Sequence, residues 1–284
     1  MKFTTLISVD GLAQFINAPN WLVIDTRFSL DDPSRGRRAY QDAHIPGALY
    51  AHLDADMCRP VVRGQTGRHP LPAVDTVAAR FGAWGITPET QVIIYDDEGG
   101  TLPAARLWWM LRWLGHENVA VLDGGYPAWV AAGQPVNTAT AAPPPVVFTP
   151  LLQSQMLATA EDVLLEFGDS GAMLIDSRGP ERYRGEIEPI DPVAGHIPGA
   201  HNYPYLSNID SKGHMQLKQI LRGRFQILFG MVPAERVTFY CGSGVTAAHN
   251  VLAVAHAGLG IPRMYAGSWS EWVADPERPV VTGN

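Results

Sequence analysis

Short apolar runs recur along the chain, and several of them end abruptly at polar residues. Residues 21–27 read WLVIDTR and residues 172–178 read AMLIDSR, so each is an apolar run closed by an acid, a hydroxyl residue and an arginine. Residues 91–96 (QVIIYD) and 236–241 (RVTFYC) form a second pair of this kind. Short runs rich in β-branched residues are typical of buried strands, so the pattern predicts strands at these four places.

The similarity between the two halves of the chain continues after the predicted strands. The pentapeptide HIPGA occupies residues 44–48 and returns at residues 196–200, at almost the same distance beyond its strand. Residues 124–129 and 267–272 both begin with glycine and end with tryptophan, after a short apolar run. Repetition of so many segments in the same order indicates that the chain holds two copies of one domain.

Helix-like stretches alternate with the predicted strands, for example at residues 103–114 and 245–257. Alternation of short buried strands with helices is typical of βα units built around a parallel sheet. The predicted fold class is therefore α/β, with two homologous domains, each a mainly parallel sheet flanked by helices.

The boundary between the copies is marked by a change in composition. Residues 133–150 are rich in Ala, Thr and Pro and include three consecutive prolines at 143–145. Such a composition favours an extended connector over packed structure. We predict a first domain at residues 1–135, a linker at 136–155 and a second domain at 156–284.

Charge and composition exclude several classes of partner. The 284 residues carry a formal net charge of −7, and the arginines are scattered, so we expect neither nucleic acid nor an anionic membrane as partner. No basic start is followed by an apolar run, and no apolar stretch has the length of a membrane span. Two cysteines supply neither a disulfide framework nor a structural zinc site. We expect a cytoplasmic protein without a bound metal.

Cys241 is the residue at which the two copies differ most in chemistry. It follows the predicted strand and opens the loop CGSGVT, in which Gly242 and Gly244 let the backbone curl around one sulfur atom. Amide groups at the start of the next helix favour a thiolate there, which predicts an activated nucleophile. The plain alternative is an inert core cysteine. In the first copy the same loop begins with acids at residues 96–98, so we expect only the second domain to be catalytic.

A strand, a cysteine loop and a helix also occur in cysteine phosphatases. Those enzymes place an arginine six residues after the nucleophile, where it binds phosphate. Here that position is Ala247, which argues against phosphatase activity.

At these residues the chain resembles the tandem rhodanese-type sulfurtransferases, in which only the second domain keeps the cysteine. Its CGSGVT loop is similar to that of 3-mercaptopyruvate sulfurtransferases, whereas thiosulfate enzymes usually place basic residues after the cysteine. The resemblance implies that Gly242, Gly244, Val245 and Thr246 of this loop contact the substrate. It also implies a substrate-binding arginine after the second Asp-Ser-Arg strand, which is Arg182 here.

The resemblance further implies a proton relay to the loop serine. The first domain of mercaptopyruvate enzymes supplies an aspartate and a histidine, and Asp54 and His69 match them, with Ser243 as the serine. Since histidine titrates near neutrality, this series can move a proton during sulfur transfer. Many mercaptopyruvate enzymes have a second arginine at the position of Asp191. Thiosulfate enzymes often have an aspartate there, so Asp191 keeps the thiosulfate alternative open.

Other conspicuous residues are expected to be structural. His44 and His196 occur in both copies, including the one without a thiol. Cys58 is expected to be a spare thiol in a loop.

The predicted reaction moves sulfur from 3-mercaptopyruvate through a Cys241 persulfide to an acceptor and releases pyruvate, without any cofactor. The acceptor is a thiol, such as thioredoxin or a small thiol, or else cyanide. Two alternatives remain: a thiosulfate:cyanide sulfurtransferase, and a noncatalytic sulfur carrier or binding module.

Overall fold

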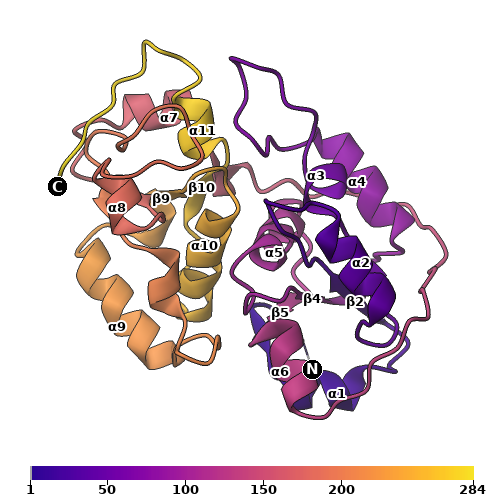
Figure 1. Ribbon diagram of the computed structural model, residues 1–284. Coiled ribbons are helices and arrows are strands. Elements are labelled where there is room, and N and C mark those ends of the chain that lie inside the picture. Colours follow the sequence, from indigo (N-terminus) through magenta and orange to yellow (C-terminus); the bar gives the residue numbers. More distant parts are fainter. Residues whose placement is uncertain (1) are drawn as a thin grey trace. The chain divides into compact units, whose positions relative to one another are not determined.

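The computed structural model describes residues 2–284, and the chain separates into two compact units (Figure 1). The first unit is made of Met1–Cys58, Pro72–Gln153 and Asp210–Met215. The second unit is made of Arg59–Leu71, Ser154–Ile209 and Gln216–Asn284. Each unit therefore contains a short segment from the other half of the chain, and Arg59–Leu71 is the one that matters for the second unit's chemistry.

Each unit is built on one five-stranded parallel sheet, as the repeated pattern predicts. The strands of the first unit have the order β1-β5-β4-β2-β3, and those of the second have the order β6-β10-β9-β7-β8, which is the same topology. The strands of the first sheet are β1 (Leu6–Ile7), β2 (Trp21–Asp25), β3 (Leu49–Tyr50), β4 (Gln91–Tyr95) and β5 (Val119–Leu122). Those of the second are β6 (Leu157–Ala158), β7 (Met173–Asp176), β8 (His201–Asn202), β9 (Val237–Tyr240) and β10 (Arg263–Tyr265).

Helices cover both faces of each sheet (Figure 1). The helices of the first unit are α1 (Val9–Phe15), α2 (Arg35–Asp42), α3 (Leu53–Asp56), α4 (Val74–Ala83), α5 (Pro103–Trp113) and α6 (Gly125–Ala131). Those of the second are α7 (Ala160–Leu165), α8 (Pro180–Tyr183), α9 (Lys218–Phe229), α10 (Thr246–His256) and α11 (Ser268–Trp272), with short 3-10 turns at Ser154–Met156, Tyr205–Asn208 and Ala234–Arg236. Helices on both faces explain why the central strands are continuously apolar.

The connector between the two copies lies along the first unit. Residues 138–153 contain neither helix nor strand. The amide of Val146 donates to the carbonyl of Gly82, and the amide of Leu151 donates to that of Leu114, each over 2.9 Å. Backbone hydrogen bonds thus fasten this proline-rich stretch to α4 and to the end of α5.

The repeated Asp-hydroxyl-Arg sequence forms the same buried ion pair in both units. Arg27 Nη2 donates to Asp25 Oδ2, and Arg178 Nη2 donates to Asp176 Oδ2, each over 2.6 Å. Each arginine also donates to a carbonyl just before the HIPGA segment, at Ala43 or at Gly195. The pair therefore ties the end of a central strand to the next loop, which gives the repeated sequence a structural explanation.

The two repeated histidines also have structural partners. The ring of His44 stacks on Tyr40 with centroids 3.9 Å apart, and the ring of His196 stacks on Tyr183 with centroids 3.7 Å apart. In both, Nδ1 lies within hydrogen-bond distance of the carbonyl of the residue on which the ring stacks. The same arrangement in both units supports a role in the fold.

Candidate functional site

Cys241 lies between the last residue of β9 and the first turn of α10, at the carboxyl end of the central strands of the second sheet. Its amide donates to Ser268 Oγ over 3.1 Å, and its carbonyl accepts from the amide of Trp269 over 3.0 Å. The carbonyl of Gly242 accepts from the amide of Ser270 over 2.9 Å. The loop that carries the thiol is therefore fixed to the start of α11.

The Cys241 sulfur is surrounded by hydrogen-bond donors. The amide of Gly244 donates to Sγ over 3.1 Å. Burial raises the pKa of this thiol, but the Thr246 hydroxyl and the amides of Ser243, Ala247 and Gly244 lower it by more, so the net pKa lies below its ordinary value. Although Cys241 is only 2% exposed, its sulfur faces polar groups, which is the environment of an activated thiol.

Glycine is required at positions 242 and 244 of the loop for different structural reasons. Gly244 has a φ of +74°, and a Cβ there would lie 2.3 Å from the carbonyl oxygen of Ala266. A Cβ on Gly242 would lie 2.8 Å from Arg68 Nη2 and 3.6 Å from both terminal nitrogens of Arg182. Gly244 thus allows the turn that aims its amide at the sulfur, and Gly242 lets two guanidinium groups approach the loop.

Arg182 lies on α8 and is held by acids. It donates to Glu188 through Nε over 3.1 Å and through Nη2 over 2.7 Å, and Nη2 also lies 3.2 Å from Asp191 Oδ2. Its side chain is 18% exposed, whereas those of Glu188 and Asp191 are 4% and 3% exposed. The acids thus position Arg182 beside the loop while part of the guanidinium stays open.

His69 and Ser243 meet as the predicted relay requires. Nδ1 of His69 lies 2.8 Å from Ser243 Oγ, and both residues are buried. His69 belongs to the segment Arg59–Leu71, which forms part of the same compact unit as Cys241. Asp54 lies on α3 in the other unit, where its amide donates to His52 Nδ1 over 3.1 Å, and its place in the relay stays a prediction.

Arg68 is a component of this site that the sequence did not single out. It precedes His69, and its Nη1 pairs with Asp191, 123 positions further along the chain. No motif marks a contact over such a separation. The sequence contained only an indirect indication of this contact. It has an acid at position 191, and an acid that is buried in the fold requires a cation nearby.

The corresponding loop of the first unit is filled by its own carboxylate. Asp96 follows β4, and its side chain accepts hydrogen bonds from the amides of Gly100 at 2.7 Å, Glu98 at 2.9 Å and Leu102 at 3.2 Å. Burial raises the pKa of this carboxyl to about 6, against the effect of the amides, which favour the ionised form. The first unit therefore holds a fixed anion where the second holds a thiol.

The second cysteine has the opposite character to Cys241. Burial raises the pKa of the Cys58 thiol, and the attraction of Arg106, whose Nη2 lies 3.9 Å from the sulfur, only partly offsets it. A protonated thiol is a poor nucleophile, which agrees with the prediction of a spare thiol.

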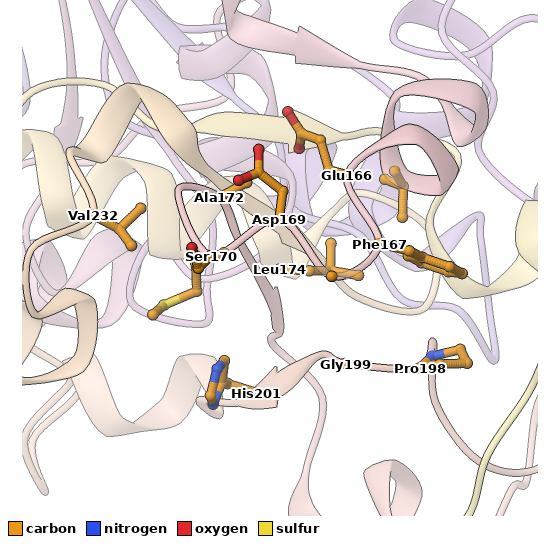
Figure 2. Close-up of a pocket in the computed structure, with 13 residues that line it drawn as sticks. Glu166, Phe167, Asp169, Ser170, Ala172, Leu174, Pro198, Gly199, His201 and Val232 are labelled. Atoms are coloured by element: carbon orange, nitrogen blue, oxygen red, sulfur yellow. The ribbon is translucent and has the colours of Figure 1, made fainter.

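The second unit contains a cavity of about 350 Å³ whose lining does not include Cys241. Figure 2 shows the residues that line it. It is lined by residues 172–174 at the amino end of β7, with Glu166 and Asp169 on one side and His201 on the other. Parallel strands direct their carboxyl ends to the opposite edge of the sheet, where Cys241 lies. This cavity is therefore not the candidate site.

No helix within residues 2–284 has both the length and the apolar composition needed to cross a bilayer. Within the same range, no group of three or more His, Cys, Asp and Glu side chains is arranged to hold a metal ion.

Comparison with known proteins agrees with the fold. The Rhodanese-like domain family matches residues 8–132 and again residues 159–275. A protein of Pseudomonas aeruginosa named "Probable 3-mercaptopyruvate sulfurtransferase" is 45% identical over the full length of both chains. A thiosulfate sulfurtransferase of Cricetulus griseus is 34% identical over 99% of this chain and 96% of its own.

A solved structure supports the same fold and family. The structure of SseA from Escherichia coli, whose title names 3-mercaptopyruvate sulfotransferases, has a TM-score of 0.79 and is 30% identical. It covers 95% of this chain and 100% of its own. Fold and loop together define a tandem α/β protein in which one of the two copies carries a nucleophilic thiol. The chain belongs to the rhodanese family, as two consecutive rhodanese-like domains.

The Thr246 hydroxyl provides a direct test of how the thiol is activated. In Thr246→Val the side chain keeps its shape but no longer donates to the sulfur, so the pKa of Cys241 rises. We expect the pH profile of alkylation by iodoacetamide to move to higher pH, with a roughly three- to tenfold slower reaction below its midpoint. Cys241→Ser gives the background from Cys58, and an unchanged profile in Thr246→Val would contradict the assignment.

The amides around Asp96 predict a structural effect in the first unit. In Asp96→Ala several buried amides lose their acceptor, which costs about 1–3 kcal/mol of unfolding free energy. The nearby Glu98→Ala is the matched control, because Glu98 is exposed and its replacement should change the unfolding free energy by only about 0.5 kcal/mol or less. Denaturant unfolding compares the two, and equal losses would refute the explanation.

Proposed function

We propose that the protein transfers sulfur from 3-mercaptopyruvate to an acceptor through a persulfide on Cys241. The observation that carries this proposal is a thiol of lowered pKa, encircled by loop amides, with two guanidinium groups beside Gly242. The Pseudomonas aeruginosa relative, matched over its full length, bears a name that includes the same donor. The geometry of the site and the name of this relative both favour an anionic donor whose sulfur is attacked by a cysteine.

In the first half-reaction the Cys241 thiolate attacks the donor's sulfur. An S–S bond forms while the carbon–sulfur bond breaks, and the electron pair of the broken bond goes to the methylene carbon. The resulting enolate of pyruvate takes up a proton and leaves as pyruvate. The loop amides, which already face Sγ, stabilise the negative charge on the reacting sulfur atoms.

The pair of Ser243 and His69 supplies a route for the proton. The donor carries a thiol proton that must leave its sulfur, and the departing enolate must gain one. A hydroxyl 2.8 Å from an imidazole nitrogen can pass a proton in either direction, because an imidazole nitrogen can accept a proton or donate one. Asp54 is the third predicted member of this relay.

Recognition of the donor falls to the guanidinium of Arg182. Mercaptopyruvate carries one carboxylate a few atoms from its sulfur, so a cation reaching the loop from another segment suits it. The loop of residues 241–246 carries no basic side chain of its own. Thiosulfate, whose charge lies next to the attacked sulfur, remains the second candidate donor because Asp191 occupies a position typical of thiosulfate enzymes.

In the second half-reaction an acceptor removes the outer sulfur and restores the thiolate. A thiolate acceptor, such as a small thiol or thioredoxin, or cyanide attacks the terminal sulfur, which gives ping-pong kinetics. These steps require no cofactor. A reducing compartment such as the cytoplasm suits an enzyme that works through a free thiol.

A comparison of two donors tests the proposal. With mercaptopyruvate we expect pyruvate release, and after donor treatment we expect the peptide containing Cys241 to gain the mass of one sulfur atom. Cys241→Ser should lower turnover by at least roughly 10³-fold, because it removes the nucleophile. Cys58→Ser, at the other thiol, should retain activity.

Three outcomes would count against the proposal. Faster sulfite release from thiosulfate than pyruvate release from mercaptopyruvate would favour the second donor. Absence of added sulfur on Cys241 with both donors would favour a noncatalytic binding module. Full activity in Cys241→Ser would exclude the persulfide altogether.

A further inference from the structure

Ser268 has a backbone conformation that few side chains adopt. Its φ is +56°, and within residues 2–284 it is the one residue other than glycine with a positive φ. In this left-handed region a Cβ lies too close to a neighbouring carbonyl oxygen, so the conformation is costly for residues other than glycine. Ser268 is fully buried at the start of α11. Backbone strain of this kind persists only where the surrounding structure holds it, and it often occurs at functional sites.

The first unit shows that the turn itself does not require serine. Gly125 corresponds to Ser268 in the repeated segments that begin with glycine and end with tryptophan, and its φ is +59°. In both units the next amide donates to the carbonyl of the residue that follows the central strand, over 2.8 Å to Asp96 and over 3.0 Å to Cys241. The same φ and the same hydrogen bond therefore form with glycine, which adopts this conformation without strain.

The two units differ in the space beside this residue. A Cβ on Gly125 would lie 2.5 Å from the carbonyl oxygen of Asp96, so the first unit has no room for a side chain there. In the second unit the Ser268 side chain fits, and its Oγ lies 3.1 Å from the backbone nitrogen of Cys241. The unit that carries the thiol thus has a strained serine where the other unit has glycine, and this serine contacts the backbone of the nucleophile.

The Ser268 hydroxyl joins the ends of two neighbouring strands. Its Oγ accepts from the amide of Cys241 over 3.1 Å and donates to the carbonyl of Tyr265 over 2.9 Å. Tyr265 is the last residue of β10, and Cys241 follows β9, which pairs with β10 in the sheet. The hydroxyl therefore fixes the amide at the point where the chain leaves the sheet. Glycine at position 268 would leave this buried amide without its acceptor, which is unfavourable.

The position of the Cys241 backbone decides whether its sulfur faces the loop donors. The amide of Gly244 lies 3.1 Å from Sγ and is fixed by a turn of its own. Hydrogen bonds weaken steeply as their distance and angle depart from the ideal values. A small shift of the Cys241 backbone would therefore weaken the bonds that lower the pKa of the thiol. Ser268 holds the nucleophile in this arrangement, whereas the turn at Gly244 holds the donor.

We infer that Ser268 is a positioning residue for the Cys241 nucleophile, and that its strained conformation is retained because its hydroxyl holds the Cys241 amide. Ser268 acts through the backbone of Cys241. The inference rests on the proposed function for its effect on turnover, whereas its effect on the reactivity of the thiol is independent of any sulfur donor. Loss of the hydroxyl should therefore slow the reactions of Cys241 even in a variant that is relieved of the strain.

Two variants separate the hydroxyl from the strain. Ser268→Ala removes the hydroxyl but keeps a Cβ at positive φ, and Ser268→Gly removes both. In denaturant unfolding Ser268→Gly should have a higher midpoint than Ser268→Ala, since both lose the same hydrogen bonds and only alanine keeps the strain. Equal midpoints, or a lower one in Ser268→Gly, would show that serine is unstrained at this position and would overturn that half of the inference.

The reactivity of Cys241 tests the positioning role without a sulfur donor. In both variants the pH profile of alkylation by iodoacetamide should move to higher pH, with a roughly three- to tenfold slower reaction below its midpoint. Cys241→Ser gives the background from Cys58. Ser170→Ala is the matched control, because Ser170 is an exposed serine of the same unit and lines the cavity at the opposite edge of the sheet. Its profile should equal that of the wild type.

A purely structural role for Ser268 predicts a different order of the variants. Reactivity would then follow stability, and Ser268→Gly would react as the wild type does. A wild-type alkylation profile in Ser268→Gly therefore overturns the positioning role, whatever the unfolding midpoints. Turnover of mercaptopyruvate should fall in both variants mainly through kcat, with KM near the wild-type value. A shifted alkylation profile in the variants of a protein whose wild type releases no pyruvate supports the positioning role and refutes the proposed donor.

Discussion

The hydrogen bonds that converge on the Cys241 sulfur are the constraint on which the rest of the site depends. A thiol buried to this extent would ordinarily stay protonated, because burial disfavours the charged form. Here one amide donates over 3.1 Å, and the Thr246 hydroxyl and further amides also lower the pKa. The φ of +74° at Gly244 and the link from Cys241 to Ser268 serve to hold those donors in place.

In the two copies of the domain, amide groups of the corresponding loop bind different anions. In the first unit the carboxylate of Asp96 accepts from the loop amides and completes the fold locally. In the second unit a thiol takes that place, and a thiolate can accept another sulfur atom as well as hydrogen bonds. Both units thus have an anion-binding turn at the end of a central strand, which holds a carboxylate in the first unit and a thiol in the second.

Much of the fold could be predicted from the sequence, because the repeated segments encode buried, local features. The Asp-hydroxyl-Arg triplets and the HIPGA segments recur since each forms a contact required by the sheet: the ion pair of Arg178 with Asp176, and the stacking of His196 on Tyr183. The position of Cys241 at a strand end followed from the same pattern. Arg68 could not be found in this way, since its contact with Asp191 joins two loops that share no periodicity.

The account as a whole depends on the hydrogen bonds to the Cys241 sulfur outweighing its burial, so that the pKa of the thiol lies below its ordinary value. The most direct measurement is the ultraviolet absorbance of its thiolate, taken as the difference between wild type and Cys241→Ser over a range of pH. The account predicts a single titration with a midpoint below that of a free thiol, which is about 8.5. A midpoint at or above that value would show that burial outweighs the hydrogen bonds, and it would contradict the account.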